Sequence, residues 1–324
     1  MSVEIASPVA DPVKSDWSNV QFEPAATNLD GSTSRFLWKY SLSFVVMHLI
    51  ALLAFWPWLF SWSGVAMCVL GVAASQFGIP ICYHRLLTHR SFKTPKWLER
   101  TWVVCALCQV QDTPAKWVAW HRQHHQHSDR AHDPHSPLVN FFWSHMGWLM
   151  FGTPSTHDIS AYHMYARDIL ADPFYMFLEK HRSVWIWIFL FHAAIILACG
   201  GALGWYLTGT ESGAWQLGLS WLIWGVVVRV VYVWHITWSV NSLSHMFGYR
   251  NYETKDVSRN NWFVAMITGG EGWHNNHHHD QRAATVQHQW WELDPNYYII
   301  RFFEKLGLVT DVVLPRHGPA AGED

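Results

Sequence analysis

Charged side chains are scarce in this sequence of 324 residues: Asp, Glu, Lys and Arg make up 14% of it, against about 25% in an ordinary soluble domain. The 22 basic and 24 acidic residues leave a formal net charge of −2, so no strong positive field favours a nucleic-acid partner. There are only five cysteines, an odd number that argues against a secreted disulfide scaffold. Half of the residues are apolar, which excludes disorder or a coiled coil as the main organisation.

The apolar residues are concentrated in four blocks that carry almost no charge. These blocks cover residues 38–62, 63–83, 184–207 and 217–240. Each approaches the roughly 20 residues that a helix needs to cross a bilayer. Because the connections near 61–64 and over 208–216 are short, the blocks predict an all-α membrane protein with two transmembrane hairpins. Four buried core helices of a soluble protein are the alternative.

The basic residues predict how the chain lies in the membrane. Neither hairpin turn contains Lys or Arg, whereas the segment between the hairpins and the region after residue 240 are rich in both. The positive-inside rule therefore predicts both termini and the middle segment on the cytoplasmic side. Within that segment, 97–111 and 140–151 are apolar but too short to span, so we expect interfacial helices.

The whole chain divides into three parts, of which the second contains the predicted spans. Residues 1–34 are rich in Ser, Pro, Ala and Asp and predict a flexible leader, with no signal peptide inferred. Residues 35–310 form the expected membrane domain, and 311–324 form a C-terminal tail.

The 22 histidines are not scattered evenly. Nine of them stand near the cytoplasmic ends of predicted spans, as an HxxxxH, two HxxHH motifs and one further histidine. They are His84, His89, His121, His124, His125, His245, His274, His277 and His278. Each HxxHH can aim three imidazoles at one point, since residues i, i+3 and i+4 share a helix face.

The two histidines of the HxxxxH motif do not share a face of a regular α-helix, because a step of five residues separates their directions by about 140°. A distorted helix end, or two neighbouring metals, would bring both rings into use, and Pro80 removes a backbone donor just before His84. Imidazole suits Fe, Zn, Cu and Ni. Nine histidines exceed what one ion can take, so the pattern predicts two metals. We expect the bordering His127, His132, His135 and His279 to lie beside the ligands or the substrate.

At these residues the chain resembles the integral-membrane fatty acid desaturases, in particular the Δ9 acyl-CoA/acyl-lipid (stearoyl-CoA desaturase-like) group. The motifs that carry the resemblance span about residues 38–310. They are HRLLTH, HRQHHQHSD, SDRAHDPHSP, FFWSHMGW, TWSVNSLSHMFGYRNY and GGEGWHNNHH.

The resemblance implies four transmembrane helices under a cytosolic, histidine-rich cap that carries two irons on the nine histidines. It further implies that Asn241 reaches one iron through a water and that Trp117 and Trp238 line the substrate path. Family members that act on acyl-CoA have an Arg–Asp pair where this chain has Ala119 and Trp120. The acyl carrier, coenzyme A or a membrane lipid, therefore stays open.

The predicted reaction is O₂-dependent insertion of a cis double bond, at Δ9 by the resemblance, into a saturated acyl chain. Side chains alone cannot remove hydrogens from unactivated CH₂ groups, so a redox metal and O₂ must supply the oxidant. No heme-binding histidine pattern is evident in the tail, so we expect a separate electron donor of the ferredoxin or cytochrome b5 type. The expected location is the bacterial cytoplasmic membrane or the endoplasmic reticulum. We expect Asp129, Asp133 and Glu271 to orient ligand histidines.

Two other functions remain open. Membrane di-iron centres of this kind also hydroxylate lipids or carotenoids, although the alkane-hydroxylase pattern has an HxxxH middle box and this chain has HxxHH. A membrane metal-binding or transport protein is the third possibility. Transporters usually place such ligands near the middle of the bilayer, whereas these boxes stand at the ends of spans.

Overall fold

The computed structural model describes residues 35–130, 132–152 and 163–316. The predicted leader, 1–34, and residues 317–324 of the predicted tail lie outside the described residues. The described chain is mostly helical, with one two-stranded antiparallel sheet that pairs β1 (Arg35–Phe36) with β2 (Phe151–Gly152). Four helices are long and apolar enough to cross a membrane. The predicted all-α membrane fold is therefore confirmed.

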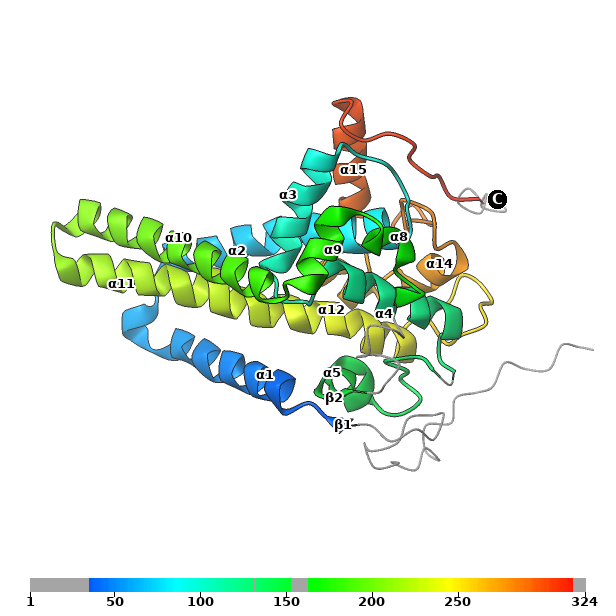
Figure 1. Ribbon diagram of the computed structural model, residues 1–324, viewed down its shortest axis with the longest axis horizontal. Coiled ribbons are helices and arrows are strands. Elements are labelled where there is room, and N and C mark those ends of the chain that lie inside the picture. Colours follow the sequence, from blue (N-terminus) through cyan, green and yellow to red (C-terminus); the bar gives the residue numbers. More distant parts are fainter. Residues whose placement is uncertain (1–34, 131, 153–162, 317–324) are drawn as a thin grey trace, which may run out of the picture.

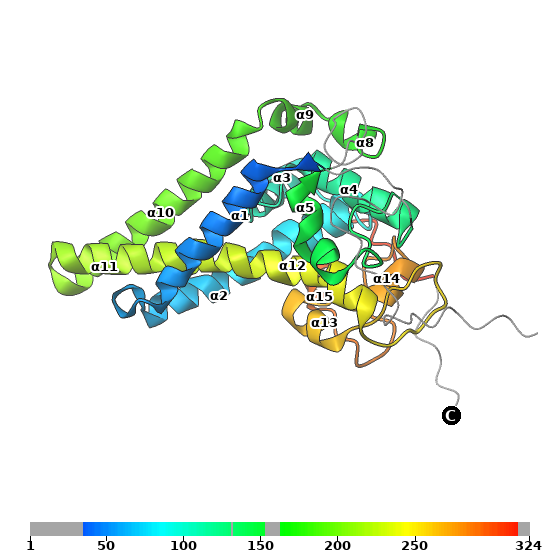
Figure 2. The same cartoon turned by 90° about the horizontal axis from the view of Figure 1, so that it is seen from below.

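The four long helices extend to one side of a cap of shorter helices (Figures 1 and 2). The first is α1 (Trp38–Ala51) with the 3₁₀ turn Leu52–Phe55, and a second such turn, Pro57–Leu59, closes the hairpin. The second joins α2 (Trp62–Gln76) to the π-helix η4 (Phe77–Thr88). The third is α10 (Ser183–Thr208), and the fourth joins α11 (Glu211–Leu222), the π-helix η6 (Ile223–Val228) and α12 (Arg229–Met246).

The helices do not end where the apolar blocks end. The first helical stretch stops at Phe55, seven residues short of the predicted 62, because Pro57 opens a separate 3₁₀ turn there. The second continues to Thr88 and the fourth to Met246. Their final residues are polar, but the cap buries them (His84 and His245 are 6% and 0% exposed). Both helices therefore carry histidines directly into the cap.

The shorter helices form the cap around these two helix ends (Figure 1). They are α3 (Lys96–Leu107), α4 (Pro114–His127), η5 (Trp143–Gly147), α5 (Trp148–Met150), α8 (Arg167–Leu170), α9 (Pro173–Lys180), α13 (Trp262–Thr268), α14 (His274–His279) and α15 (Pro295–Lys305). The predicted interfacial segment 97–111 is largely α3, which packs along η4. The second, 140–151, contains η5 and α5, packed against α12 and α1.

Two close contacts hold these elements together. Gly204 lets α10 and α11 touch, since a Cβ at this position would lie 2.3 Å from the carbonyl oxygen of Gly213. Gly270 has φ +117°, a backbone conformation that L side chains rarely adopt, and it faces the Asp294 carboxylate.

The charged Arg229 within the fourth helix is buried and donates to Gln109 Oε1 at 2.6 Å. Its charge thus faces protein rather than lipid.

Candidate metal centre

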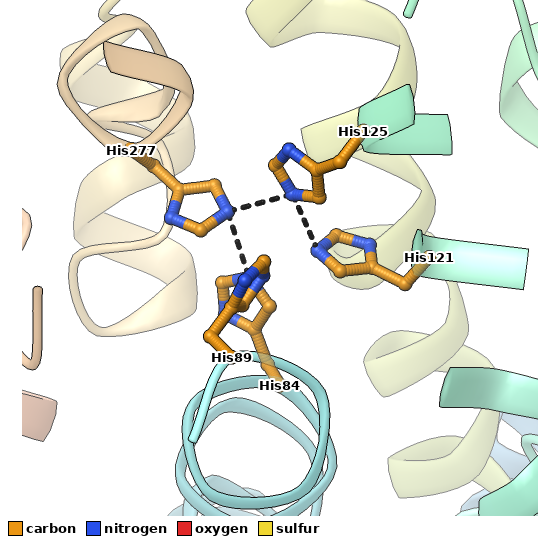
Figure 3. Close-up of side chains that lie close together, drawn as sticks. All are labelled: His84, His89, His121, His125 and His277. Atoms are coloured by element: carbon orange, nitrogen blue, oxygen red, sulfur yellow. Dashed lines mark hydrogen bonds between the residues drawn. The ribbon is translucent and has the colours of Figure 1, made fainter. Parts of the chain in front are cut away.

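The structure gathers all nine predicted histidines into two adjacent groups. The first contains His84, His89, His121, His125 and His277, and the second His124, His245, His274 and His278. Within each group the candidate ligand nitrogens lie within 4.8 Å of one another. Figure 3 shows the first group, with imidazoles from η4, α4 and α14 converging on one point. The groups combine residues up to 193 positions apart in the sequence.

Local helix geometry explains why the histidine side chains of each motif point to the same side. The π-helix η4 closes i→i+5 hydrogen bonds, and the His89 amide donates to the His84 carbonyl at 3.1 Å. This distortion brings both histidines of the HxxxxH motif to one side. The two HxxHH motifs lie on α4 and α14, where spacings of three and four residues share a face.

Carboxylates fix four of the imidazoles by accepting a hydrogen bond from Nδ1. The pairs are His84–Glu271 at 2.6 Å, His124–Asp133 at 3.0 Å, His245–Asp129 at 3.1 Å and His278–Asp256 at 2.9 Å. Such contacts select the tautomer with the hydrogen on Nδ1, which leaves a lone pair on Nε2 for a metal. The three predicted acids thus all contact histidines of the two groups, whereas Asp256 was missed, because nothing in its spacing sets it apart from a loop charge.

Some Nε2 atoms of the ligand histidines lie close together with no hydrogen between them, an arrangement that a bound cation would stabilise. Nε2 of His124 lies 3.3 Å from Nε2 of His278, yet both residues have their Nδ1 hydrogen directed at a carboxylate. Neither nitrogen has a hydrogen left to donate. Nε2 of His89 and of His245 are buried and have no hydrogen-bond partner among the described residues. Two nitrogens that bind one metal at about 2.1 Å in neighbouring positions lie about 3 Å apart. The donor set therefore fits transition-metal ions.

Burial also keeps five histidines of α4 and α14 neutral. It lowers the pKa of His121, His124, His125, His274 and His277 well below the usual range, and neighbouring imidazoles add to the effect. A neutral imidazole is the form that binds a metal. Glu271, in contrast, stays ionised. Burial works against its charge, but Arg85 and then His84 outweigh burial and lower its pKa to about 2.

Arg85 connects the second long helix to the last histidine box. Its guanidinium donates to Glu271 Oε1 at 2.6 Å and to Asp294 Oδ1 at 2.9 Å, and all three side chains are buried. Because Glu271 also holds His84, this network fixes the end of η4 against the loop before α14. Removing one partner of such a buried network leaves an uncompensated charge.

Two cavities meet beside the first group. A cavity of about 710 Å³ extends between α1, α4, α10 and α12, and one of about 60 Å³ lies between the second and fourth long helices. Both are lined by Trp117, His121, Thr237 and Asn241. The volume of the larger cavity is in the range of pockets that enclose small apolar ligands. Together they form a mostly apolar path beside His84, His121 and His274.

Four further predicted residues, Trp117, Trp238, Asn241 and His135, line this path. Trp117 stacks on His121 with ring centroids 5.1 Å apart. Trp238 lines the larger cavity and packs against Trp234, and Asn241 lies at the junction of the two cavities. His135 lies beside His124 with ring centroids 4.3 Å apart, and its Nδ1 is 3.8 Å from the Asp133 carboxylate. It stands at the border of the second group, as expected of a neighbour of the ligands.

Comparison with known proteins agrees with the motif resemblance. The fatty acid desaturase family model matches residues 58–310. The sn-1 stearoyl-lipid 9-desaturase of Synechocystis is 42% identical over 86% of this chain and 80% of its own length. The palmitoyl-monogalactosyldiacylglycerol delta-7 desaturase of Arabidopsis thaliana is 40% identical over 83% of this chain and 67% of its own. An acyl-CoA 5-desaturase of Anemone leveillei is 39% identical over 83% and 77%.

These relatives match most of the chain, and every histidine box lies within the residues that the family model matches. The family predicted from the motifs is confirmed. The chain is a membrane oxidoreductase that belongs to the fatty acid desaturase family.

Proposed function

We propose that the protein inserts a cis double bond, at Δ9, into a saturated acyl chain carried by a membrane lipid, with O₂ as the oxidant and two irons as the cofactor. The observation that carries this proposal is that a mostly apolar path is lined by histidines of both groups. A metal-transport protein would have no use for such a path, and no described feature favours that alternative.

In this proposal the nine histidines hold the two irons, five on one and four on the other. Asn241, at the cavity junction, would bind one of the irons through a water, as the family resemblance implies. Iron is preferred over zinc because zinc has no redox chemistry. When bound, the irons supply the oxidising power that activates O₂ against a C–H bond.

The overall reaction balances with two electrons and two protons from outside. One –CH₂–CH₂– unit, O₂, two electrons and two protons give one –CH=CH– unit and two waters. The chain's own residues bind the alkyl chain in the apolar path, exclude bulk water from it and hold the reacting carbons beside His84 and His121. Because a displacement of about 1 Å can cost on the order of 100-fold in rate, the path's shape selects the bond that reacts.

The architecture around the larger cavity supports a lipid as the carrier. Ala119 and Trp120, where acyl-CoA-using family members have an Arg–Asp pair, are both buried and offer no charge to a coenzyme A head. The cavity is also lined by Ser43 of α1 and Ile186 of α10, two exposed residues of membrane-spanning helices. An acyl tail could thus slide in from the bilayer while its head stays at the interface. The names of the Synechocystis and Arabidopsis relatives agree with a lipid carrier.

We further propose that the cap and both termini face the cytoplasm, of a bacterial cell or beside the endoplasmic reticulum. The basic residues support this orientation, since most of them lie in the cap and not in the hairpin turns.

The direct test is product analysis. The chain is expressed in a host that lacks a Δ9 desaturase, and the fatty acids of each lipid class are resolved by gas chromatography. A new cis-9 monounsaturated acid in intact glycerolipids supports the proposal. A hydroxylated acid would instead indicate the hydroxylase, and an unchanged profile with accumulated metal would indicate transport.

A further inference from the structure

Three histidines outside the metal centre form a hydrogen-bonded row. His48 of α1 and His145 of η5 lie on either side of His235 of α12, and each ring nitrogen of His235 is 3.0 Å from a nitrogen of one neighbour. Contacts with the carbonyl of Phe44 at 2.7 Å and the hydroxyl of Ser242 at 2.9 Å complete what we call the histidine row. Two of its members belong to long apolar helices. Ionisable side chains are costly in such helices and usually serve a function there.

The contact with Phe44 fixes the hydrogens of the whole row. A carbonyl oxygen only accepts, so Nδ1 of His48 donates to it and Nε2 of His48 is left as an acceptor. His235 then donates through Nε2 and accepts through Nδ1 from Nε2 of His145. Because a neutral imidazole has one donor and one acceptor, every nitrogen of the row is used. No ring can turn without breaking a hydrogen bond on both of its sides.

The histidine row lies behind the wall of the substrate path. Within the described chain, none of its three rings lines either of the two cavities that form the path. The elements that the row joins do line the larger cavity. Phe44 comes from α1, Trp238 from α12, and Trp148 from α5, which follows η5 directly. The row therefore fixes three walls of the path relative to one another from the outside.

Trp238 transmits this constraint to the path. Its ring packs edge-to-face against His145 and His235, with ring centroids 5.8 and 5.3 Å away. On its other sides it meets Phe44 at 5.4 Å and stacks on Trp234 at 5.7 Å. The indole is thus enclosed by aromatic rings, two of which belong to the row. Its position in the cavity wall depends on the position of those two imidazoles.

We propose that the histidine row is a positioning device that selects which carbon–carbon bond of the acyl chain reacts. The inference rests on the proposed function, in which the acyl chain lies in this path. Neighbouring CH₂ groups are chemically alike, so only their place along the path distinguishes them. A displacement of about 1 Å can cost on the order of 100-fold in rate. Walls that are held rigidly by the row therefore favour one position, whereas walls that can shift admit its neighbours.

The test follows the position of the double bond. The full chain is expressed in a host that lacks a Δ9 desaturase, and mass spectra of the dimethyl disulfide adducts locate the double bonds. His235→Leu removes both central hydrogen bonds of the row. It should raise the fraction of double bonds outside the wild-type position by at least about tenfold, with the iron per chain unchanged. His235→Gln keeps a donor and an acceptor and should restore most of the selectivity.

Ser220→Ala is the matched control. The hydroxyls of Ser220 and Ser61 lie 2.7 Å apart and join α11 to the start of α2, at the end of the long helices away from the cap (Figure 1). This variant also loses a hydrogen bond between helices, yet its double bonds should keep the wild-type position. Ser242→Ala removes only the last partner of the row and should scatter the double bonds less than His235→Leu. It carries the test should His235→Leu fail to fold.

An unchanged double-bond position in the folded, iron-loaded row variants, or equal scatter in Ser220→Ala, would overturn the proposal. A hydroxylated acid from the wild type would overturn the proposed function instead, and the position of the hydroxyl group would then test the row in the same way.

Should the wild type oxidise no acyl chain, the proposed function fails and the row is judged by distance. Spin labels are attached at Val45→Cys on α1 and Phe141→Cys before η5, both exposed positions, after the exposed Cys199 is replaced by Ser. The distribution of distances between the labels should broaden in His235→Leu and not in Ser220→Ala. Equal distributions in the wild type and His235→Leu would overturn the proposal.

Discussion

His84 and His89 are five residues apart, yet their ring centroids lie 4.8 Å apart on the same side of the second long helix. A regular α-helix would turn them about 140° away from each other. The π-helical hydrogen bond from the His89 amide to the His84 carbonyl removes that separation. The π-helical winding at the end of η4 thus directs both histidines of the HxxxxH motif into the first histidine group.

Single histidine substitutions should empty the two groups separately. His125→Ala removes a nitrogen from the first group and His278→Ala one from the second. Each variant should lose about one of two iron equivalents by elemental analysis and all detectable desaturation, because the reaction needs both metals. His181→Ala, at an exposed position near the start of α10, is the control and should keep both. Full activity in both site variants would refute the assignment of these ligands.

Asp256 offers a test of a contact that sequence patterns did not suggest. Its carboxylate accepts from His278 Nδ1 at 2.9 Å, and Asp256→Asn removes the charge that fixes the tautomer. Loss of such a partner typically costs 10- to 100-fold in metal affinity, which competition with a chelator would measure. Glu253→Gln changes a carboxylate in the same loop whose side chain is 81% exposed, and it should leave the affinity unchanged. Equal affinities for wild type and Asp256→Asn would show that this contact does not support the metal.

Thr237 lies where the two substrate cavities meet. Thr237→Trp should fill that junction, so that long acyl chains no longer pass the histidines. Lipid desaturation should fall by on the order of 100-fold, while the bound iron is retained. Tyr232→Trp, on the same helix but 41% exposed, adds bulk on the outside and should be tolerated. Gas chromatography and metal analysis on the same preparations separate the two effects. Wild-type activity in Thr237→Trp would place the acyl chain elsewhere.

Glu271 predicts a dependence of stability on pH in the metal-free protein. Its pKa falls from 4.5 to about 2 in the folded chain, so the stabilisation is present above about pH 4.5 and is lost as the pH falls toward 2. From the shift alone the loss is about 2 kcal/mol by pH 3. Thermal unfolding in detergent should show a smaller decrease between pH 5 and pH 3 for Glu271→Gln than for the wild type. Parallel curves for the two proteins would contradict this role.

The sequence predicted the membrane fold and the nine histidines that cluster, but not their division into two groups or the other details that depend on packing. Apolar blocks mark where lipid surrounds a helix, and the cap buries further turns of the same helices, so the ends at Thr88 and Met246 could not be read from hydropathy. Glu271 and Asp133 stand near histidine boxes in the sequence and were predicted for that reason. Asp256 was not, because its contact with His278 forms only when the loop after α12 folds over α14.

Contacts between isolated histidines could not be predicted from the sequence either. His48, His145 and His235 belong to none of the histidine motifs, yet they form a hydrogen-bonded row, with nitrogen separations of 3.0 Å at both links. The row ties α1 and η5 to α12, three elements that lie far apart in the sequence.

The central claim, that nine histidines hold two irons which oxidise an acyl chain, is tested most directly by the iron content of active enzyme. The protein is purified in lipid nanodiscs, its iron is measured per chain, and the yield of cis-9 product is followed as iron is removed by a chelator and restored. Two irons per chain, with activity that disappears and returns with them, is the predicted result. Full desaturase activity at one iron or none per chain, or with zinc in place of iron, would contradict it.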